Sequence, residues 1–185
     1  MENYEIEAKY RVKDLDKILK YITEKLGLKK YMTCIETDYY FNHPCRDFRQ
    51  TDEALRIRRV LCQDLESIVL TYKGPREDSE LGIKKRIEIE TIVNDLDKIL
   101  MILEKLGFKQ VIVFSKERTT YKNEDLVVTI DRLYGIGTFM EIETSSIEVI
   151  KKIREDLANY IEPVAKTYLE ICLETQKCVD LRDIL

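Results

Sequence analysis

Residues 5–12 read EIEAKYRV, and this stretch decides the fold. Charged and apolar side chains alternate through it. Because successive side chains of a β-strand point to opposite faces, Glu5, Glu7, Lys9 and Arg11 share one face, and the other face is apolar. Two carboxylates two residues apart on one face can share a divalent cation. A lysine next along the same face suits an anion that the cation also holds.

The same alternation recurs along most of the chain. It predicts seven further strands, at about 31–42, 54–62, 66–73, 83–92, 109–122, 125–133 and 138–144. The charged positions are the cations Lys9, Arg11, Arg56, Arg58, Lys73, Lys84, Arg86, Lys116 and Arg118 and the carboxylates Glu5, Glu7, Glu88, Glu90, Asp131, Glu141 and Glu143. For any single strand, a polar face turned to solvent is the simpler explanation. Because both signs recur on strand after strand, we favour a sheet closed into a barrel, with these charges in its lumen.

The composition narrows the class of ligand. Charged residues make up 36% of the chain but its net charge is only −4, which excludes a basic nucleic-acid-binding protein. A lumen lined by both signs suits divalent cations, which satisfy carboxylates, and a polyphosphate, which satisfies arginine and lysine. No apolar run reaches the length that spans a membrane, and the charged strand begins directly after residue 3. We therefore expect neither a membrane segment nor a signal peptide.

The chain contains an internal echo. Residues 5–19 resemble residues 86–100, and each segment continues to a Lys-Leu-Gly. Each copy predicts a strand, then a helix with one apolar stripe, then a second strand. Asp14 and either Asn94 or Asp95 are expected to cap the two helices.

The C-terminal part predicts more helix. A third helix is expected at about 146–160, and the amphipathic tail 163–175 is expected to pack on the rest of the protein. Pro163 separates the two segments. The whole chain, 1–185, is therefore predicted to be a single domain built from two echoing β-α-β halves.

The cysteines and the histidine are not expected to form a metal site or to take part in catalysis. The five cysteines, at positions 34, 45, 62, 172 and 178, are odd in number and form no Cys-x-x-Cys. We therefore expect neither a zinc site nor a disulfide framework, and we expect a reducing cytoplasm. The cysteines are interpreted as small apolar fillers. His43, the single histidine, is interpreted as a loop residue.

Several motifs occur in an order that is typical of a known family. They are Glu5-x-Glu7-x-Lys9, Leu55-Arg56-x-Arg58, Thr71-x-Lys73-Gly74, Arg86-x-Glu88-x-Glu90, Lys116-x-Arg118, Asp131, Glu141-x-Glu143 and Lys166-Thr167-Tyr168. On these residues the chain resembles the CYTH superfamily, also called triphosphate tunnel metalloenzymes, over nearly its whole length. The last motif departs from the family pattern, with Thr167 in place of serine. The family includes class IV adenylyl cyclases, thiamine triphosphatases and inorganic triphosphatases.

The resemblance implies a fold and a site. The fold would be α+β, an eight-stranded antiparallel β-tunnel closed as a barrel, with helices packed outside. Mg²⁺ or Mn²⁺ would be held by Glu5, Glu7 and Glu143, and Asp131 and Glu141 would help to bind a second, catalytic metal. Phosphate oxygens would be bound by Lys9, Arg56, Arg58, Lys73, Lys116 and Arg118, with Lys166 as a further contact. Arg86 and Glu88 would line the tunnel or pair with each other.

Three functions stay open on this evidence. We favour a metal-dependent triphosphatase that hydrolyses inorganic triphosphate, a nucleoside triphosphate or thiamine triphosphate. The runner-up is a class IV adenylyl cyclase, which converts ATP to cyclic AMP and pyrophosphate with the same metal and phosphate apparatus; residues 38–42 resemble such cyclases, but we identify no adenine site. The third is a non-catalytic polyphosphate or nucleotide binding module. We expect a cytoplasmic protein that binds a triphosphate-containing small molecule and neither nucleic acid nor membrane, and a homodimer is compatible with the family.

Overall fold

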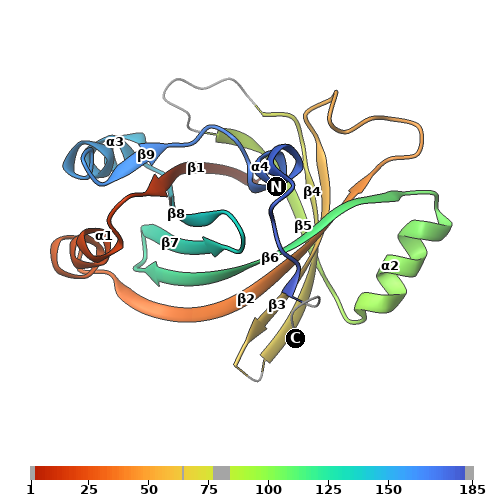
Figure 1. Cartoon of the computed structure of the whole chain (residues 1–185), viewed down its shortest axis with the longest axis horizontal. Helices are drawn as coiled ribbons and strands as arrows, with labels where there is room; N and C mark the ends of the chain where they lie inside the picture. The colour runs from red at the N-terminus through yellow and green to blue at the C-terminus, as the bar shows by residue number, and fades with distance from the viewer. Residues whose placement is uncertain (1–2, 64, 77–83, 182–185) are drawn as a thin grey trace.

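An antiparallel β-barrel forms the body of the protein (Figure 1). The computed structural model describes residues 3–63, 65–76 and 84–181, apart from the side chains of residues 3–6, 84 and 85. The barrel strands are β1 (Asn3–Val12), β2 (Lys29–Asn42), β3 (Ala54–Cys62), β4 (Leu65–Lys73), β5 (Lys84–Val93), β6 (Lys109–Lys122), β7 (Leu126–Leu133) and β8 (Gly137–Thr144). Their order is β5-β4-β3-β2-β6-β7-β8-β1, and β1 also pairs with β5, which closes the ring. The predicted α+β fold, an eight-stranded antiparallel tunnel with helices outside, is confirmed.

In the part of the chain that the structure describes, four α-helices lie outside the barrel. They are α1 (Leu15–Lys20), which continues into the π-helical turn η1 (Tyr21–Lys25), α2 (Leu96–Lys105), α3 (Ile147–Asp156) and α4 (Tyr168–Thr175). The echo in the sequence corresponds to the units β1-α1-β2 and β5-α2-β6. Asp14 and Asp95 cap the two helices by accepting hydrogen bonds from the backbone N–H groups of Lys17 and Lys98. Within the described ranges, no helix is both long and apolar enough to cross a bilayer.

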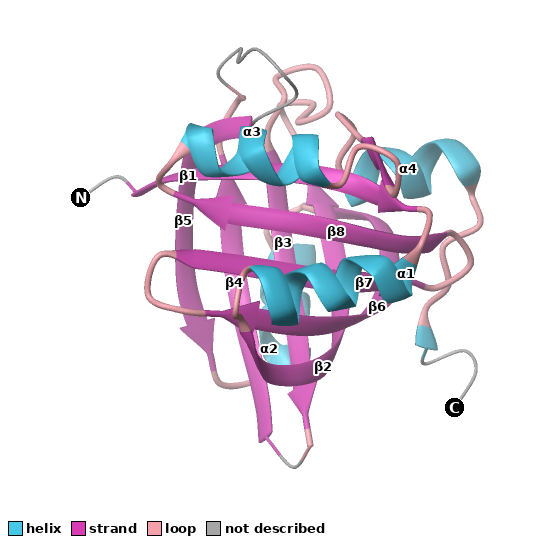
Figure 2. Cartoon of the chain, turned by 90° about the vertical axis from the view of Figure 1, so that its left-hand side faces the viewer, coloured by secondary structure: helices cyan, strands magenta, loops and turns pink. Residues whose placement is uncertain are grey.

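The apolar strand faces are covered from two sides. Helices α1 and α3 lie across the strands on one side of the barrel (Figure 2), and α2 lies on the other side (Figure 1). Ile18 of α1 and Ile150 of α3 are buried in one core cluster with Ile142 of β8. Leu103 of α2 is buried in a second cluster with Ile57 of β3. Full burial of one such side chain stabilises the fold by about 1.5–3 kcal/mol, so this packing turns the charged faces inward.

The third helix is shorter than the sequence predicts. It ends at Asp156, and residues Ile161–Pro163 form a short strand, β9, which pairs with β1. The predicted amphipathic tail forms α4, which begins after Thr167. The Thr167 side chain caps the helix, and the carboxylate of Glu170 accepts a hydrogen bond from the Thr167 backbone in return. This capping box fixes where α4 starts.

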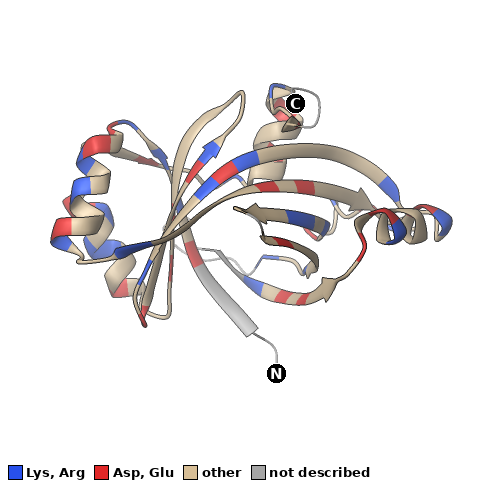
Figure 3. Ribbon diagram, turned by 90° about the horizontal axis from the view of Figure 1, so that it is seen from below, with Lys and Arg blue, Asp and Glu red and all other residues tan. Residues whose placement is uncertain are grey.

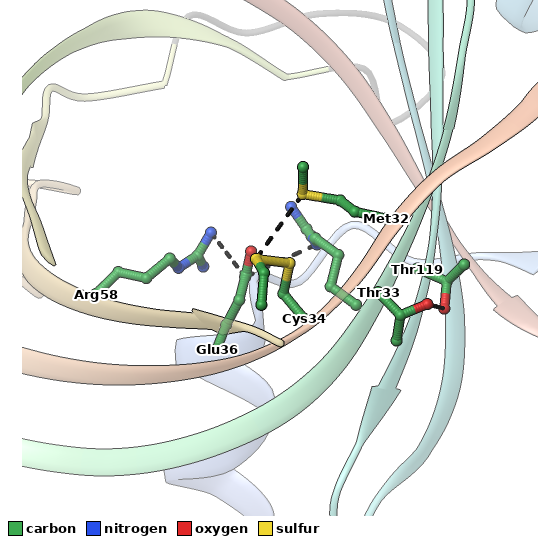
Figure 4. Close-up of a disulfide and its surroundings, with 8 residues drawn as sticks. Met32, Thr33, Cys34, Glu36, Arg58 and Thr119 are labelled. Atoms are coloured by element: carbon green, nitrogen blue, oxygen red, sulfur yellow. Dashed lines mark hydrogen bonds and ion pairs between the residues drawn. A yellow bond between two sulfur atoms is a disulfide. The ribbon is translucent and has the colours of Figure 1, made fainter. Parts of the chain in front are cut away.

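The expectation of no disulfide is wrong. Cys34 is bonded to Cys62 (Figure 4), and Cys172 is bonded to Cys178; among the described cysteines only the exposed Cys45 is free. Cys34 and Cys62 lie on neighbouring strands with their Cα atoms 4.3 Å apart. The parity of the cysteine count carries no information about such distances, which the register of β2 and β3 determines. The two pairs also remove the argument from cysteine chemistry for a reducing compartment.

Candidate active site

The barrel contains a strongly charged cavity of about 210 Å³. Its wall is formed by Glu7, Lys9, Tyr40, Arg56, Arg58, Lys73, Arg86, Glu88, Glu90, Lys116, Arg118, Val127, Thr129, Glu141, Glu143, Thr167 and Tyr168. Figure 3 shows positive and negative residues side by side on several strands. Val127 is the one aliphatic side chain in this wall. The cavity therefore suits a small, highly charged ligand.

Most of the residues singled out in the sequence lie on this wall. They are Glu7, Lys9, Arg56, Arg58, Lys73, Arg86, Glu88, Lys116, Arg118, Glu141 and Glu143. They come from β1, β3, β4, β5, β6 and β8, so residues far apart in the chain meet across the lumen. The alternation of side chains along each strand accounts for this placement.

Three predicted residues are placed differently. The side chain of Glu5 lies outside the described residues, although its backbone pairs with Arg86. Asp131 is fully buried behind the cavity wall. Lys166 is exposed and pairs with Glu174 on α4, so the structure does not bring it to the cavity wall. Lys166 is not on a barrel strand, and its position follows from the start of α4 directly after it.

Four cations and four carboxylates form one connected group, the balanced cluster. Its members are Lys9, Arg58, Lys116, Arg118, Glu36, Asp38, Asp131 and Glu141. Arg58 donates from Nε to Asp38 Oδ1 over 2.6 Å and from Nη2 to Asp38 Oδ2 over 2.8 Å. Arg118 Nε donates to Asp131 Oδ1 over 2.7 Å. These forked contacts fix both guanidinium groups in the wall.

Neighbouring cations lower the pKa of three carboxylates in the balanced cluster, Glu36, Asp38 and Glu141. Burial alone would raise the pKa of Glu36, but Arg58, Lys116 and Arg118 lower it to about 2. Burial likewise opposes ionisation of Glu141, yet Lys9 and Arg118 hold its pKa well below the ordinary value. The charges of these three carboxylates are therefore compensated by neighbouring cations rather than neutralised by a proton.

A second group, the cationic cluster, consists of Arg56, Lys73, Arg86, Glu88 and Glu90. Lys73 pairs with Glu88, and Arg86 Nε lies 3.4 Å from the same carboxylate. Arg56 lies 3.6 Å from Glu90, and among the described residues no acceptor bonds its buried Nε. Burial and the nearby Arg56 lower the pKa of Lys73 to about 8, although Glu88 opposes this. Among the described residues, Arg56, Lys73 and Arg86 meet the carboxylates of Glu88 and Glu90 here, and Glu7 also acts on Lys73.

Helix α4 contributes one aromatic residue to the wall. Tyr168, the first residue of α4, donates its hydroxyl to Asp131 Oδ2 over 2.8 Å. The Lys9 ammonium lies 3.5 Å from the centre of the Tyr168 ring. Burial, with Asp131 and Glu141 nearby, raises the pKa of Tyr168 well above its ordinary value, so its hydroxyl keeps its proton. The tyrosine thereby supports both Asp131 and Lys9.

A family model of the CYTH domain matches residues 3–166. The chain belongs to the CYTH family. A protein of Methanocaldococcus jannaschii, provisionally named an adenylate cyclase, is 37% identical over 177 residues, 90% of this chain and 97% of that protein. The adenylate cyclase CyaB of Aeromonas hydrophila is 32% identical over 142 residues, 75% of this chain and 68% of that protein. A solved structure from Pyrococcus horikoshii OT3 matches with a TM-score of 0.75 and 34% identity, covering 91% of this chain and 98% of that chain.

One pair of carboxylates in this CYTH chain fits a metal ion. CYTH enzymes are metal-dependent. Glu7 on β1 and Glu143 on β8 stand directly opposite each other in the strand register, and both line the cavity. Like charges in this arrangement destabilise a strand pair, and a divalent cation, which prefers carboxylate oxygens, relieves the repulsion. Among the described side chains, no group of three or more His, Cys, Asp or Glu is placed to hold a metal, so this pair is an incomplete ligand set.

The contacts of Asp131 and Glu141 do not favour a metal ion between these two carboxylates. Arg118 contacts both oxygens of Asp131, and Tyr168 and Lys116 also contact Oδ2. Glu141 is engaged by Lys9 at 3.0 Å and by Arg118. With these oxygens occupied, both carboxylates are placed to orient cations rather than to ligate a second metal.

Sequence reasoning assigned no role to three members of the CYTH site. Glu36 and Asp38 on β2 belong to the balanced cluster, and Tyr168 lines the cavity. A signal for the first two was present, because they alternate with Ile35 and Thr37 as the charges of other strands do. Tyr168 belongs to the Lys166-Thr167-Tyr168 motif, but a role was expected only for Lys166, and the fold brings Tyr168 to the lumen instead.

Proposed function

We propose that this chain is a metal-dependent triphosphatase that hydrolyses inorganic triphosphate or the triphosphate group of a nucleoside or thiamine ester. CYTH enzymes include adenylyl cyclases and triphosphatases, so the choice lies between two uses of one apparatus. The observation that carries our choice is the cavity itself. At about 210 Å³ it is smaller than the roughly 300–1,000 Å³ of sites that enclose a drug-sized organic ligand. Its size and its charged wall favour binding of the triphosphate within the cavity, with any attached organic group outside the cavity.

The wall residues would act by charge and position. Phosphoryl transfer requires mainly charge neutralisation and alignment, not a nucleophile from the protein. Arg56, Lys73 and Arg86 line the cavity and would neutralise the phosphate oxygens of the incoming triphosphate. Lys9, Arg58, Lys116 and Arg118 would take further oxygens, with their orientation fixed by the balanced cluster.

The metal would be held by carboxylates that belong to neither cluster. Glu7 and Glu143, with Glu5 as the proposed third ligand, would hold Mg²⁺ or Mn²⁺. Such an ion, when bound, supplies a Lewis acid at the phosphoryl group and a water of lowered pKa. The homodimer, the cytoplasmic location and the single-domain organisation remain predictions from the sequence.

Adenylyl cyclase activity is the second candidate, because the relatives from M. jannaschii and A. hydrophila carry that name. A cyclase must place the ribose 3′-oxygen of ATP against its α-phosphorus, and so must hold the nucleoside close to the charged wall. A non-catalytic polyphosphate or nucleotide binding module would need the cations but not the opposed pair Glu7 and Glu143.

The first experiment is a product assay. Purified protein with Mg²⁺ or Mn²⁺ is given tripolyphosphate and ATP separately, and the products are separated by chromatography. We expect orthophosphate and pyrophosphate from tripolyphosphate, and a loss of turnover of at least about 100-fold in Glu7→Gln, because the metal loses a charged ligand. Glu162→Gln removes the same charge from the exposed strand β9 and should retain wild-type turnover.

Other products would replace this proposal. Cyclic AMP with pyrophosphate from ATP would make the chain a cyclase. Metal-dependent binding of nucleotide without any product would favour the binding module. Equal turnover by Glu7→Gln and wild type would show that the opposed carboxylates do not serve the reaction.

A further inference from the structure

One carboxylate of the balanced cluster contacts three cations at once. Oε2 of Glu36 lies 2.9 Å from Arg58 Nη1, 3.2 Å from Lys116 Nζ and 3.8 Å from Arg118 Nε. The three cations come from β3 and β6, the neighbours of β2 on either side. Figure 4 shows Glu36 and Arg58 directed toward each other. All three cations line the cavity and are assigned to phosphate under the proposed function.

Glu36 and Asp38, two residues apart on β2, make different kinds of contact with the cations. Asp38 holds Arg58 alone, through two well-formed hydrogen bonds. Among the described residues, no donor makes a geometrically formed hydrogen bond to Glu36 Oε2, so its three contacts are ion pairs. Asp38 therefore orients an arginine, whereas Glu36 acts mainly through its charge.

The surrounding cations favour the ionised form of Glu36. Burial alone would raise the pKa of Glu36, but the three cations lower it to about 2. The side chain is only 9% exposed, so water screens the charge little. An anion that enters the cavity consequently meets a fixed negative charge among the cations that should bind it.

We propose that Glu36 moderates the affinity of the tunnel: it competes with substrate and product phosphates for Arg58, Lys116 and Arg118. This inference rests on the proposed function, since it concerns the same phosphate site. The empty tunnel is stabilised by the three ion pairs, and a triphosphate must displace them in part. The same competition weakens the hold on pyrophosphate and orthophosphate, and so helps the products to leave.

The proposal predicts the opposite sign from a purely structural role. Glu36→Gln keeps the shape of the side chain and removes its charge. The three cations are then undercompensated in the empty protein, which loses stability, and they attract phosphate more strongly. If Glu36 only held the wall together, its loss would misplace the cations and weaken phosphate binding.

The test measures binding of tripolyphosphate by calorimetry in EDTA, where metal-dependent turnover is absent. We expect the dissociation constant to fall by at least about fivefold in Glu36→Gln, from the loss of one charge at close range. Glu36→Asp retains the charge and should stay within about twofold of wild type. The matched control is Glu66→Gln, which removes a carboxylate paired with Arg59, a residue of β3 outside the cavity wall. It should leave the dissociation constant unchanged.

Weaker or unchanged binding by Glu36→Gln would overturn the proposal, and so would equal tightening by Glu36→Asp. If Glu36→Gln does not fold, a crystal structure of the wild-type protein with tripolyphosphate decides the question. At least one of the three ion pairs of Glu36 should then lengthen beyond 4 Å, and retention of all three overturns the proposal. The product assay distinguishes failure of the Glu36 proposal from failure of the proposed function. A wild-type protein that neither binds nor cleaves tripolyphosphate refutes both proposals. A wild-type protein that is active, with unaltered affinity in Glu36→Gln, refutes only the Glu36 proposal.

Discussion

At the scale of single residues, neighbouring charges and burial determine whether a lysine on the cavity wall keeps its proton near neutral pH. Lys116 lies 3.2 Å from Glu36 and 3.4 Å from Asp131, and these carboxylates oppose the lowering of its pKa by burial and by Arg118. Lys73 pairs with Glu88 but also has Arg56 and Arg86 nearby, and its pKa is lowered to about 8. Lys73 is thus a cation on the cavity wall whose charge changes close to neutral pH.

The lowered pKa of Lys73 predicts a pH dependence of phosphate binding. Above pH 8 free Lys73 loses its proton, whereas a bound phosphate would raise its pKa, so binding would take up a proton. The dissociation constant for tripolyphosphate should therefore rise by up to about tenfold per pH unit above pH 8. Lys73→Arg keeps its charge throughout, and it separates the titration of the protein from that of tripolyphosphate. Calorimetry in EDTA between pH 7 and 9.5 measures both, and parallel curves for the two proteins would contradict the prediction.

The sequence contained part of this information about residues. Alternation placed Arg56, Arg58 and Lys73 on one face of their strands, and all three line the cavity. Alternation cannot tell which carboxylate each of them meets, because that depends on the register between strands. Arg58 is opposite Asp38 because β2 and β3 pair in one register out of several.

At the scale of elements, the strands were predictable and the role of α4 was not. Each strand carries its own period-two signal, and Asp14 and Asp95 gave direct helix-start signals. Helix α4 reaches the site through Tyr168, which donates its hydroxyl to the fully buried Asp131. Nothing local to residues 166–168 indicates that contact, since it joins α4 to β7 across the fold.

The contact predicts a cost when the hydroxyl is removed. Tyr168→Phe keeps the ring beside Lys9 but takes one donor from a buried carboxylate, which should lower the free energy of unfolding by about 1–3 kcal/mol. Urea unfolding measures the change. Tyr31→Phe is the matched control: Tyr31 is 56% exposed and should change stability by less than about 0.5 kcal/mol. Equal stability of Tyr168→Phe and wild type would show that Arg118 and Lys116 suffice for Asp131.

At the scale of the whole molecule, closure of the barrel turns scattered charges into one site. The pairing of β1 with β5 brings the two echoing units together around the lumen. Closure was favoured from the sequence because charges of both signs recur on the polar faces of successive strands, and an open sheet would leave them in water. The disulfide between Cys34 and Cys62 was not predictable in this way, since 28 residues separate the two cysteines and only the paired strands bring them together.

That disulfide predicts a measurable contribution to the stability of the barrel. It closes a loop that includes most of β2 and β3, and in the chain-entropy account such a crosslink stabilises by about 3 kcal/mol, because it restricts the unfolded chain. The double variant Cys34→Ala, Cys62→Ala should lose about this much in urea unfolding under oxidising conditions. Cys45→Ala changes the exposed free cysteine and should match wild type. With a dithiol reductant the wild-type protein should lose at least as much, since Cys172–Cys178 is reduced as well. If the double variant unfolds at the wild-type urea concentration, the barrel does not depend on this crosslink, and the packing of α1, α2 and α3 on its outer face holds it closed.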